Sequence, residues 1–331
     1  MYAKQLEEFL TNMITAKLPV LVKGKPGGGK TSIIKLVGKK LKQKVRIKHP
    51  VVDEPIDYKG MPSIQGDVAK FLPFGDLNEL ITTKEDLIVF FDDLGQASPA
   101  VQAALMQLFL ERRINGHMIS PTVTFVAATN RQQDRAGVSG MLEPVKSRFV
   151  TIVELETKLD DWMEWAIQNN LSPMLRSFFN FRPNLLHDFK PTGDLVNSPA
   201  PRTAHNIDKM MKAGIPEAVF YEVIAGAAGE GFAAEFSAYV KFHNELPDIK
   251  QILTDPMEAT VPENIGVQYA LCGKLVEEAT KANVANIIKY VGRLSKEFEI
   301  FLTRDIAISK PECAKTTAFI AWLGKNDKVM I

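Results

Sequence analysis

The residues from Gly24 to Thr31 have the composition and spacing of a loop that binds phosphate. They read Gly-Lys-Pro-Gly-Gly-Gly-Lys-Thr and match the pattern G-x-x-x-x-G-K-[ST] in full. In such a loop the glycines turn backbone N–H groups towards the phosphates, the lysine reaches the β- and γ-phosphates, and the threonine hydroxyl ligates Mg²⁺. The predicted cofactors are ATP and Mg²⁺, and the predicted nucleotide-binding residues are Gly24, Pro26, Gly27, Gly28, Gly29, Lys30, Thr31 and Ser32. We expect the Lys30 side chain to be exposed in the empty site, because it serves phosphate rather than the core.

Two adjacent carboxylates form a second reactive group. Asp92 and Asp93 follow the apolar run 87–91, which predicts a strand that delivers them to the edge where α/β proteins bind ligands. We expect Asp92 to hold Mg²⁺ and Asp93 to orient and deprotonate the attacking water. The alternative, an Asp-rich turn that ends a strand, is weakened by the phosphate loop in the same chain.

A polar amide, Asn130, ends a further apolar run at residues 123–128. If that strand lies between the strands that lead to the phosphate loop and to Asp92, the amide lies beside the γ-phosphate. This arrangement favours an ATP-hydrolysing enzyme over a small-molecule kinase. The alternative is that Asn130 is a turn former that caps the next loop.

The elements that position these residues alternate in type along the first half of the chain. Short apolar runs alternate with helical patterns, as a parallel α/β sheet requires. None alternates strictly between apolar and polar residues, which indicates strands covered on both faces. The five predicted strands are residues 20–22, 45–47, 87–91, 123–128 and 150–153.

The second half of the chain is predicted to be helical. We place the domain boundary near residue 155, with an α/β domain over residues 1–155 and a helical region over residues 156–331. The predicted helices are residues 160–170, 173–180, 202–211, 216–244, 265–279 and 284–305.

The overall charge gives no sign of a polyanionic partner. Forty Lys and Arg residues stand against 39 Asp and Glu residues, a net charge of +1. One local exception is a run of basic residues without an acid, which reads as a nucleic-acid patch, as a solvated basic face or as a surface that faces a neighbouring subunit. The last two are favoured because no aromatic residues interleave for base stacking. The run comprises Lys35, Lys39, Lys40, Lys42, Lys44, Arg46 and Lys48.

The sequence predicts a cytoplasmic protein without a membrane span. Its first residues carry acids where an export signal has basic and apolar regions. The most apolar stretch, residues 218–240, contains three glutamates, which are costly in hydrocarbon. Cys272 and Cys313 have no metal or redox spacing and fit packed thiols in a reducing compartment.

Taken together, these motifs resemble the AAA+ ATPases and, within them, the MoxR-like group. The resemblance spans about the first two thirds of the chain, and from residue 216 onward no chemically specific motif supports it. Its further segments read Phe90-Phe-Asp-Asp-Leu-Gly-Gln-Ala97, Ser98-Pro-Ala-Val-Gln-Ala-Ala-Leu105, Ala127-Ala-Thr-Asn130, Lys146-Ser-Arg-Phe149 and Asn197-Ser-Pro-Ala-Pro-Arg-Thr203.

The resemblance implies a P-loop AAA+ core followed by a helical lid. It implies a Mg²⁺-dependent ATPase that forms a homo-oligomeric, hexameric ring and remodels or assembles a protein partner, with a von Willebrand factor A-domain protein as a candidate. Two alternatives stay open: a nucleic-acid-processing ATPase of the loader type, and a nucleotide-binding switch with little hydrolysis.

The resemblance also implies roles for individual residues. Asn130 matches the first sensor, Arg148 the arginine finger that enters a neighbouring subunit's site, and Arg202 the second sensor. Arg135 is the second candidate for the finger. Without the resemblance, Arg148 and Arg202 would be read as surface ion-pair residues.

One catalytic position departs from the family pattern. The family usually has Glu after the Mg²⁺ aspartate, and Asp93 is one methylene shorter. The lytic water must shift to suit it, which keeps slow hydrolysis or a nucleotide switch open.

Two insertions are expected to lie near a substrate. Asn115-Gly116 predicts the turn of a β-hairpin, and MoxR-like proteins carry a hairpin before the first sensor strand. The long segment 53–77 also matches a family insertion. Its Tyr58, Phe71 and Phe74 either grip a polypeptide in a central pore or pack the segment onto the core.

Overall fold

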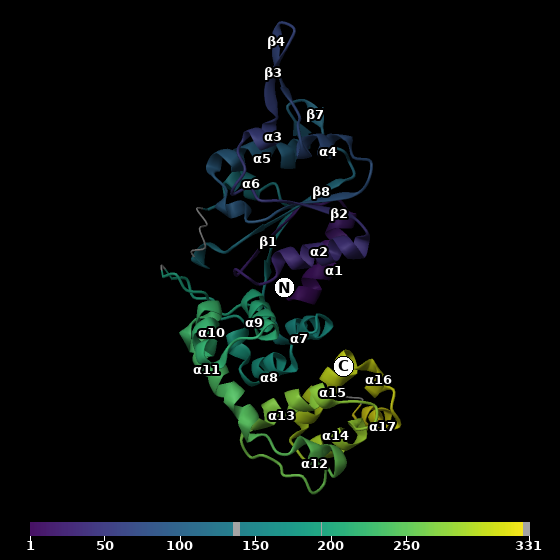
Figure 1. Cartoon of the computed structure of the whole chain (residues 1–331). Helices are drawn as coiled ribbons and strands as arrows, with labels where there is room; N and C mark the ends of the chain where they lie inside the picture. Colours follow the sequence, from purple (N-terminus) through teal and green to yellow (C-terminus); the bar gives the residue numbers. More distant parts are fainter. Residues whose placement is uncertain (135–139, 193, 327–331) are drawn as a thin grey trace. The chain divides into compact units, whose positions relative to one another are not determined.

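The computed structural model describes residues 1–134, 140–192 and 194–326 and divides the chain into two units (Figure 1). The first unit contains Met1–Lys158 with Phe189–Pro191, and the second contains Leu159–Asp188 with Thr192–Ile331. The first is an α/β unit, and the described part of the second contains helices and loops. Each unit is described by itself.

A five-stranded parallel sheet forms the centre of the first unit. Its strand order is β2-β5-β8-β1-β9, so β8 lies between β5 and β1. All five predicted strands are confirmed, and the central position of β8 is the one that the Asn130 prediction required. The strands are β1 (Val20–Gly24), β2 (Lys44–Lys48), β5 (Leu87–Phe91), β8 (Val123–Thr129) and β9 (Thr151–Leu155).

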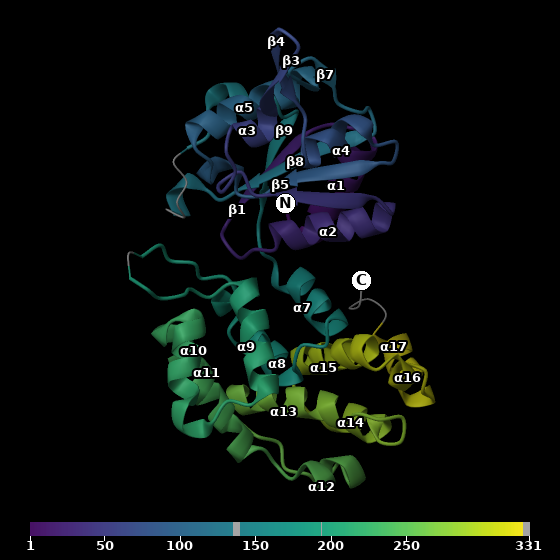
Figure 2. The same ribbon diagram turned by 45° about the horizontal axis from the view of Figure 1, so that its top comes forward.

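Helices cover both faces of this sheet (Figure 2). Alternate strand residues point to opposite sides: Val20 and Val22 pack with α1 (Ala3–Thr15) and α2 (Lys30–Leu41), and Leu21 packs on the side of α5 (Pro99–Glu111). This explains why β5 and β8, which are buried along their whole length, show no strict alternation of apolar and polar residues. The expectation is wrong for β2, which lies at the edge of the sheet: it reads Lys-Val-Arg-Ile-Lys and alternates strictly. The Ser98 hydroxyl accepts a hydrogen bond from the Val101 N–H and so caps α5, as its position before Pro99 suggests.

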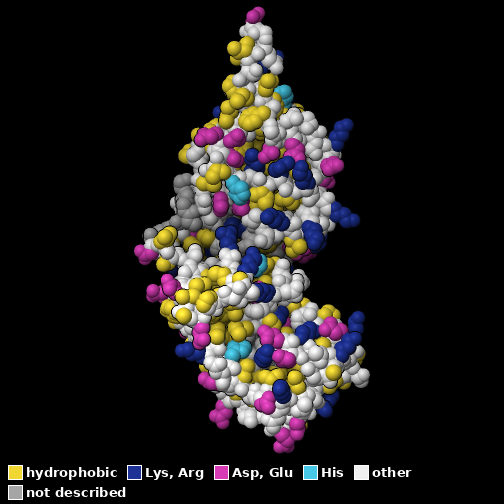
Figure 3. Space-filling model, in the orientation of Figure 1, with side chains coloured by type: hydrophobic (Ala, Val, Ile, Leu, Met, Phe, Trp, Pro, Cys, Tyr) yellow, Lys and Arg dark blue, Asp and Glu magenta, His cyan; other side chains and the backbone are white. Residues whose placement is uncertain are grey.

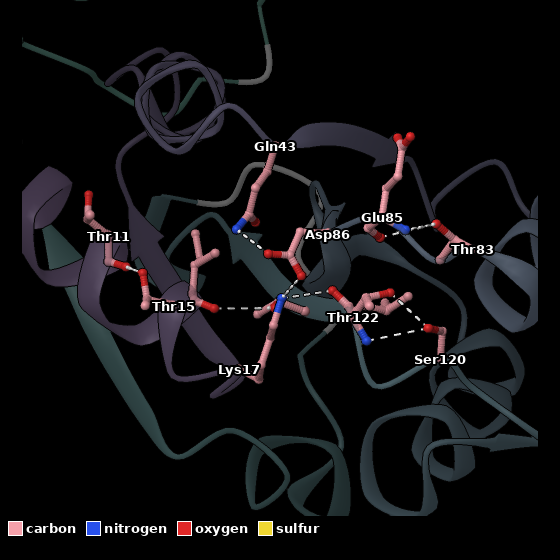
Figure 4. A network of polar contacts seen from close by, with 12 residues as sticks. Thr11, Thr15, Lys17, Gln43, Thr83, Glu85, Asp86, Ser120 and Thr122 are labelled. Atoms are coloured by element: carbon pink, nitrogen blue, oxygen red, sulfur yellow. Dashed lines mark hydrogen bonds and ion pairs between the residues drawn. The ribbon is translucent and has the colours of Figure 1, made fainter.

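One group of polar contacts joins the N-terminal ends of four of the parallel strands, β1, β2, β5 and β8 (Figure 4). Lys17 Nζ lies 2.6 Å from Asp86 Oδ1 and 2.9 Å from the Thr122 carbonyl oxygen, and Gln43 Nε2 lies 3.2 Å from Asp86 Oδ2. These residues stand just before β1, β2, β5 and β8. We call this group the strand-start clamp.

Two antiparallel hairpins extend from the first unit. The predicted hairpin at Asn115-Gly116 is confirmed: β6 (Arg113–Ile114) pairs with β7 (His117–Met118), and the turn residues have φ of 43° and 90°. The segment 53–77 contains a second hairpin that was not predicted. Its strands are β3 (Met61–Gln65) and β4 (Val68–Leu72), and its flanking helices are α3 (Ile56–Lys59) and α4 (Asp76–Thr82).

Every helix predicted for the second unit is present, but two of them are interrupted. The predicted helix 216–244 is broken at Gly229, whose φ of +88° suits glycine and ends the first of two helices. The predicted helix 284–305 is broken between Val291 and Lys296, where Gly292 ends one helix and Ser295 starts the next. The apolar periodicity of the sequence did not reveal these breaks, because in each case the same periodicity continues from the first observed helix into the second.

The helices of the second unit have the following bounds: α7 (Leu159–Gln168), α8 (Pro173–Phe181), α9 (Pro201–Ala213), α10 (Phe220–Ala228), α11 (Glu230–Lys241), α12 (Ile249–Thr254), α13 (Ile265–Glu278), α14 (Val284–Val291), α15 (Lys296–Ser309), α16 (Pro311–Ala314) and α17 (Thr317–Lys325). Short 3₁₀ turns lie at Pro183–Leu186, Glu217–Val219 and Phe242–Glu245, and the first unit has further short helices at Leu94–Gln96, Gln132–Asp134 and Glu143–Lys146. In the described parts of the chain, no helix has the length and apolar character needed to cross a membrane.

A Gly273→Ala substitution is expected to destabilise the second unit. A Cβ at Gly273 would lie 2.6 Å from Ser177 Oγ and 3.1 Å from the Pro173 carbonyl oxygen, across the contact of α13 with α8. Ser177 is held in place, because its hydroxyl accepts a hydrogen bond from the buried Tyr239 hydroxyl at 2.7 Å. Overpacking of this kind costs about 1–3 kcal/mol, which exceeds the helix-propensity gain of at most about 1 kcal/mol.

The matched control for that substitution is Gly226→Ala in α10. Among the described residues, no atom outside the neighbouring residues and the helix's own backbone lies within 4 Å of a Cβ built there, so the propensity gain is the expected effect. Thermal or urea unfolding should show a lower free energy of unfolding for Gly273→Ala and an unchanged or higher one for Gly226→Ala. Equal stability of the two variants would contradict the tight α8–α13 contact.

Candidate functional site

The predicted phosphate loop joins β1 to α2 and turns its backbone sharply. Gly27 and Gly29 have φ of 72° and 96°, a region that other residues adopt only with strain. The helix begins at Lys30, so the N–H groups of Lys30, Thr31 and Ser32 belong to its first turn, where α-helical geometry gives them no intrahelical acceptor. The loop therefore presents backbone donors at the edge of the sheet where β1 ends.

The Lys30 side chain is buried, so the expectation of an exposed lysine is wrong. It is 7% exposed, and its ammonium donates to the carbonyl oxygens of Gly24 at 3.0 Å and Lys25 at 3.1 Å and to Asn130 Oδ1 at 2.8 Å. A buried ammonium needs acceptors, and here the loop's own backbone supplies two of them. The sequence does not show this, because backbone carbonyl groups are common to all residues.

Thr31 and Asp92 come together at the same edge. The Thr31 hydroxyl donates to Asp92 Oδ2 at 2.6 Å, and the other oxygen, Oδ1, accepts from the Asp93 N–H at 3.1 Å. Asp92 is 9% exposed. A hydroxyl and a carboxylate are hard oxygen donors of the kind that Mg²⁺ takes, so these two residues fit the ion predicted for them.

Asn130 joins the phosphate loop to the second carboxylate. Its Oδ1 accepts from Lys30, and its Nδ2 donates to Asp93 Oδ1 at 3.1 Å. Asp93 itself has φ of 55° and ψ of 34°, the left-handed region that a non-glycine residue adopts at a cost. The sheet order explains the contact, because β8 carries Asn130 between β1 and β5.

The three predicted arginines lie on other elements or outside the described residues. Arg148 lies between the short helix Glu143–Lys146 and β9, is half-buried, and has a buried Nε without a hydrogen-bond partner among the described residues. Arg202 is exposed on α9 of the second unit. Arg135 falls in the segment 135–139, outside the described residues.

A charged cluster beside Asn130 was missed by the sequence analysis. Arg131 binds both oxygens of Asp134, and Glu154 of β9 lies between Arg131 and Lys23. The hydrogen bond to Asp134 raises the pKa of Arg131 above its ordinary value. Burial acts in the opposite direction, and the hydrogen bond to Glu154 raises the pKa further. Burial opposes ionisation of Glu154, but hydrogen bonds from Lys23 and Arg131 outweigh it and lower its pKa. The available signal was Glu154 itself, a charged residue directly after the predicted strand 150–153.

The basic run at residues 35–48 is partly neutralised by acids from other elements. Lys40 pairs with Glu7 at 2.9 Å, Arg46 with Glu79 at 2.6 Å, and Lys48 with Asp76 at 3.2 Å. Hydrogen bonds from Lys44 and then Arg46 lower the pKa of Glu79, with burial opposing them. Four of the seven basic residues of the run, Lys40, Lys44, Arg46 and Lys48, thus pair with acids.

The β3–β4 hairpin carries apolar side chains that are exposed (Figure 3). Ile64 is 80% exposed and Phe71 is 44% exposed, and the strand register places both on one face. Phe74 is exposed as well, whereas Tyr58 is buried and its hydroxyl donates to Asp53. Tyr58 therefore packs the segment onto the core, which is one of the two interpretations of these aromatic residues. Phe71 and Phe74 are accessible, as the other interpretation, contact with a polypeptide, requires.

Comparison with known proteins finds a family match within the first unit. Residues 20–156 match the AAA family, described as the ATPase family associated with various cellular activities. This stretch begins at β1 and extends one residue beyond β9, so it contains the whole five-stranded sheet. The sequence has no significant match among curated proteins.

Solved structures of similar fold cover most of the chain at low identity. The RuvB Holliday junction branch migration motor of Thermotoga maritima is 18% identical over 77% of this chain and 75% of its own, with a TM-score of 0.41. NtrX from Brucella abortus, in complex with ADP, is 11% identical over 99% of this chain and 68% of its own, with a TM-score of 0.43. At these values neither protein informs the activity of this chain.

Proposed function

We propose that the chain, whose residues 20–156 form an AAA family domain, is a Mg²⁺-dependent ATPase of the MoxR-like group. In this proposal residues 1–155 are the catalytic α/β domain, and residues 156–331 are a helical lid and C-terminal region. The chain forms a cytoplasmic, hexameric ring and uses ATP hydrolysis to remodel or assemble a protein partner.

The observation that supports hydrolysis is the continuous contact from the phosphate loop to a carboxylate. Lys30 contacts Asn130 at 2.8 Å, and Asn130 contacts Asp93 at 3.1 Å. A γ-phosphate held by the lysine would thus lie next to an amide and a base, the two groups that hydrolysis needs to orient and deprotonate water. An Asp-rich turn or a simple glycine turn would not require this chain of contacts.

The residues divide the reaction between them. Lys30 exchanges its carbonyl acceptors for phosphate oxygens, and Asn130 and Asp93 hold the water. The water oxygen bonds to the γ-phosphorus as the bond to ADP breaks, and Asp93 takes the water's proton. Thr31 and Asp92 would hold Mg²⁺, which supplies positive charge to the phosphates when bound. Arg148 of a neighbouring subunit and Arg202 would add positive charge.

The exposed hairpin supports a protein as the partner. Ile64 and Phe71 expose apolar side chains on one face of a two-stranded element and Val68 exposes one on the other face, and exposed apolar patches mark interaction sites. A von Willebrand factor A-domain protein remains the proposed client class on the family resemblance.

The nucleic-acid alternative loses part of its support. It rested on the basic run at residues 35–48, and Lys40, Arg46 and Lys48 of that run pair with acids in this structure. A loader-type ATPase would be stimulated by DNA or RNA, and the stimulation would weaken as salt is raised. We expect neither polymer to change the rate.

Replacement of Lys30 by alanine tests nucleotide binding directly. The variant is expected to bind ATP about 10- to 100-fold more weakly, because a charge-assisted hydrogen bond contributes about 1.5–3 kcal/mol. Equilibrium titration with a fluorescent ATP analogue measures this. Lys35→Ala, at an exposed position of the same helix, is the matched control and should bind as the wild type does. Unchanged affinity in Lys30→Ala, with the fold intact by circular dichroism, would refute the phosphate-loop assignment.

A further inference from the structure

The charged cluster at the end of β8 has a geometry that the proposed hydrolysis does not yet use. Arg131 Nε donates to Asp134 Oδ2 at 2.9 Å, and Nη2 donates to Oδ1 at 2.7 Å. The third nitrogen, Nη1, donates to Glu154 Oε1 at 3.2 Å, and Lys23 Nζ lies 3.1 Å from Glu154 Oε2. The guanidinium thus binds two carboxylates at once, one of them through both oxygens.

This cluster connects three neighbouring strands at the edge that carries the site. Lys23 of β1 is in register with Thr129 of β8 on one side and with Glu154 of β9 on the other. Arg131 follows Thr129 by two residues. The cluster therefore fixes the point at which the chain leaves β8 relative to β1 and β9.

The contact of Arg131 with Asp134 is the most buried in this cluster. The side chain of Asp134 is 5% exposed, that of Arg131 19% and that of Glu154 29%. Charge-assisted, two-pronged contacts of arginine with a carboxylate combine strength with a fixed orientation. Lysine cannot reproduce that orientation, because its ammonium is a single point of charge.

Asn130 is the residue whose position depends on this attachment. It lies between Thr129, the last residue of β8, and Arg131, and its amide must reach both Lys30 and Asp93. Its two hydrogen bonds, at 2.8 and 3.1 Å, tolerate little movement of the backbone.

We infer that Arg131 is a positioning residue that orients the Asn130 amide between Lys30 and Asp93. It acts through the backbone, by anchoring the residue that follows Asn130 to Asp134 and Glu154. The inference rests on the proposed function, in which Asn130 helps to hold the attacking water. It adds a residue to that function that neither the motif nor its spacing singles out.

The test compares Arg131→Met and Arg131→Lys with the same substitutions at Arg112. Arg112 is a matched control: it anchors the opposite end of β8 through bonds of 2.8 Å from Nη2 to the carbonyl oxygens of Ser120 and Val123. Steady-state ATPase kinetics should show kcat about 10- to 100-fold lower in Arg131→Met with KM within about twofold, since a 1 Å misplacement can cost on the order of 100-fold. Arg131→Lys should recover only part of that loss.

Arg112→Met should lower the melting temperature and leave kcat near the wild-type value. Loss of kcat at Arg131 alone therefore supports the positioning role. The positioning role would be overturned if kcat fell in both variants in proportion to their melting temperatures, or if kcat did not fall in Arg131→Met. In either case, ATP turnover by the wild type would still support the proposed function.

A second measurement is independent of ATP hydrolysis. The side-chain amide signal of Asn130 in nitrogen-15-labelled protein, assigned with Asn130→Asp, reports whether its bond to Asp93 is made. Arg131→Met should shift or broaden this signal, and Arg112→Met should not. An unchanged Asn130 signal in Arg131→Met would overturn the inference, whether or not the wild type hydrolyses ATP. Absence of hydrolysis by the wild type would refute only the proposed function.

Discussion

An Arg148→Ala variant is expected to bind ATP with wild-type affinity and to hydrolyse it about 10³- to 10⁵-fold more slowly. That loss corresponds to about 4–7 kcal/mol of transition-state stabilisation, the contribution of an arginine supplied to a phosphoryl-transfer site. In this chain Arg148 is half-buried, and its Nε has no hydrogen-bond partner among the described residues. Arg113→Ala, at an exposed position of the same unit, should retain the wild-type rate.

Mixed rings test whether Arg148 acts in a neighbouring subunit. An Asp93→Asn subunit has an intact Arg148, which it can supply to the site of an Arg148→Ala neighbour whose Asp93 is intact. Two nearly inactive variants should therefore recover activity when mixed under conditions that allow subunits to exchange. Wild-type turnover by Arg148→Ala, or assembled mixed rings that show no recovery, would exclude the trans assignment.

The second large effect is expected at Asp93. Asp93→Asn should bind ATP and Mg²⁺ and hydrolyse about 10²- to 10⁴-fold more slowly, because the amide keeps the size of the side chain and removes the base. The contact with Asn130 can persist, since the new amide oxygen can still accept its N–H. Asp93→Glu is the matched control, because it keeps a carboxylate, and it should retain far more activity. Single-turnover hydrolysis measured beside ATP binding separates the steps.

Asp92→Asn should give a different phenotype. The residue accepts the Thr31 hydroxyl, and loss of its charge should raise the Mg²⁺ concentration needed for half-maximal activity. Equal phenotypes for the two aspartates would remove the grounds for their separate roles. Because Asp93→Asn should accumulate bound ATP, it is also the variant with which to retain and identify a protein client.

The fold could be predicted because its signals are local. Most of the five strands are short runs rich in apolar residues that alternate with helices along the chain, and successive residues such as Leu21 and Val22 pack on opposite faces. The helix breaks at Gly229 and Gly292 could not be predicted from periodicity. A single glycine is tolerated in many helices, and whether it ends one depends on what the next segment packs against.

The candidate site could be predicted as a set of residues but not as an arrangement. The spacing of the phosphate loop identified Lys30 and Thr31, and the ends of apolar runs identified Asp92 and Asn130. The burial of Lys30 depends on backbone carbonyl groups that no motif encodes. The ion pair of Arg131 with Glu154 joins residues 23 positions apart in sequence and becomes visible only when β8 and β9 flank β1.

The strand-start clamp has a consequence for the order in which the chain can complete its first unit. Its contacts join Lys17 to Asp86 and to Thr122, which are 69 and 105 positions further along the chain. Each contact closes a long loop, so it can form only after the intervening strands have been brought together. During synthesis from the amino terminus, the clamp stays incomplete until Thr122 has left the ribosome, and by then β1, β2 and β5 have already emerged.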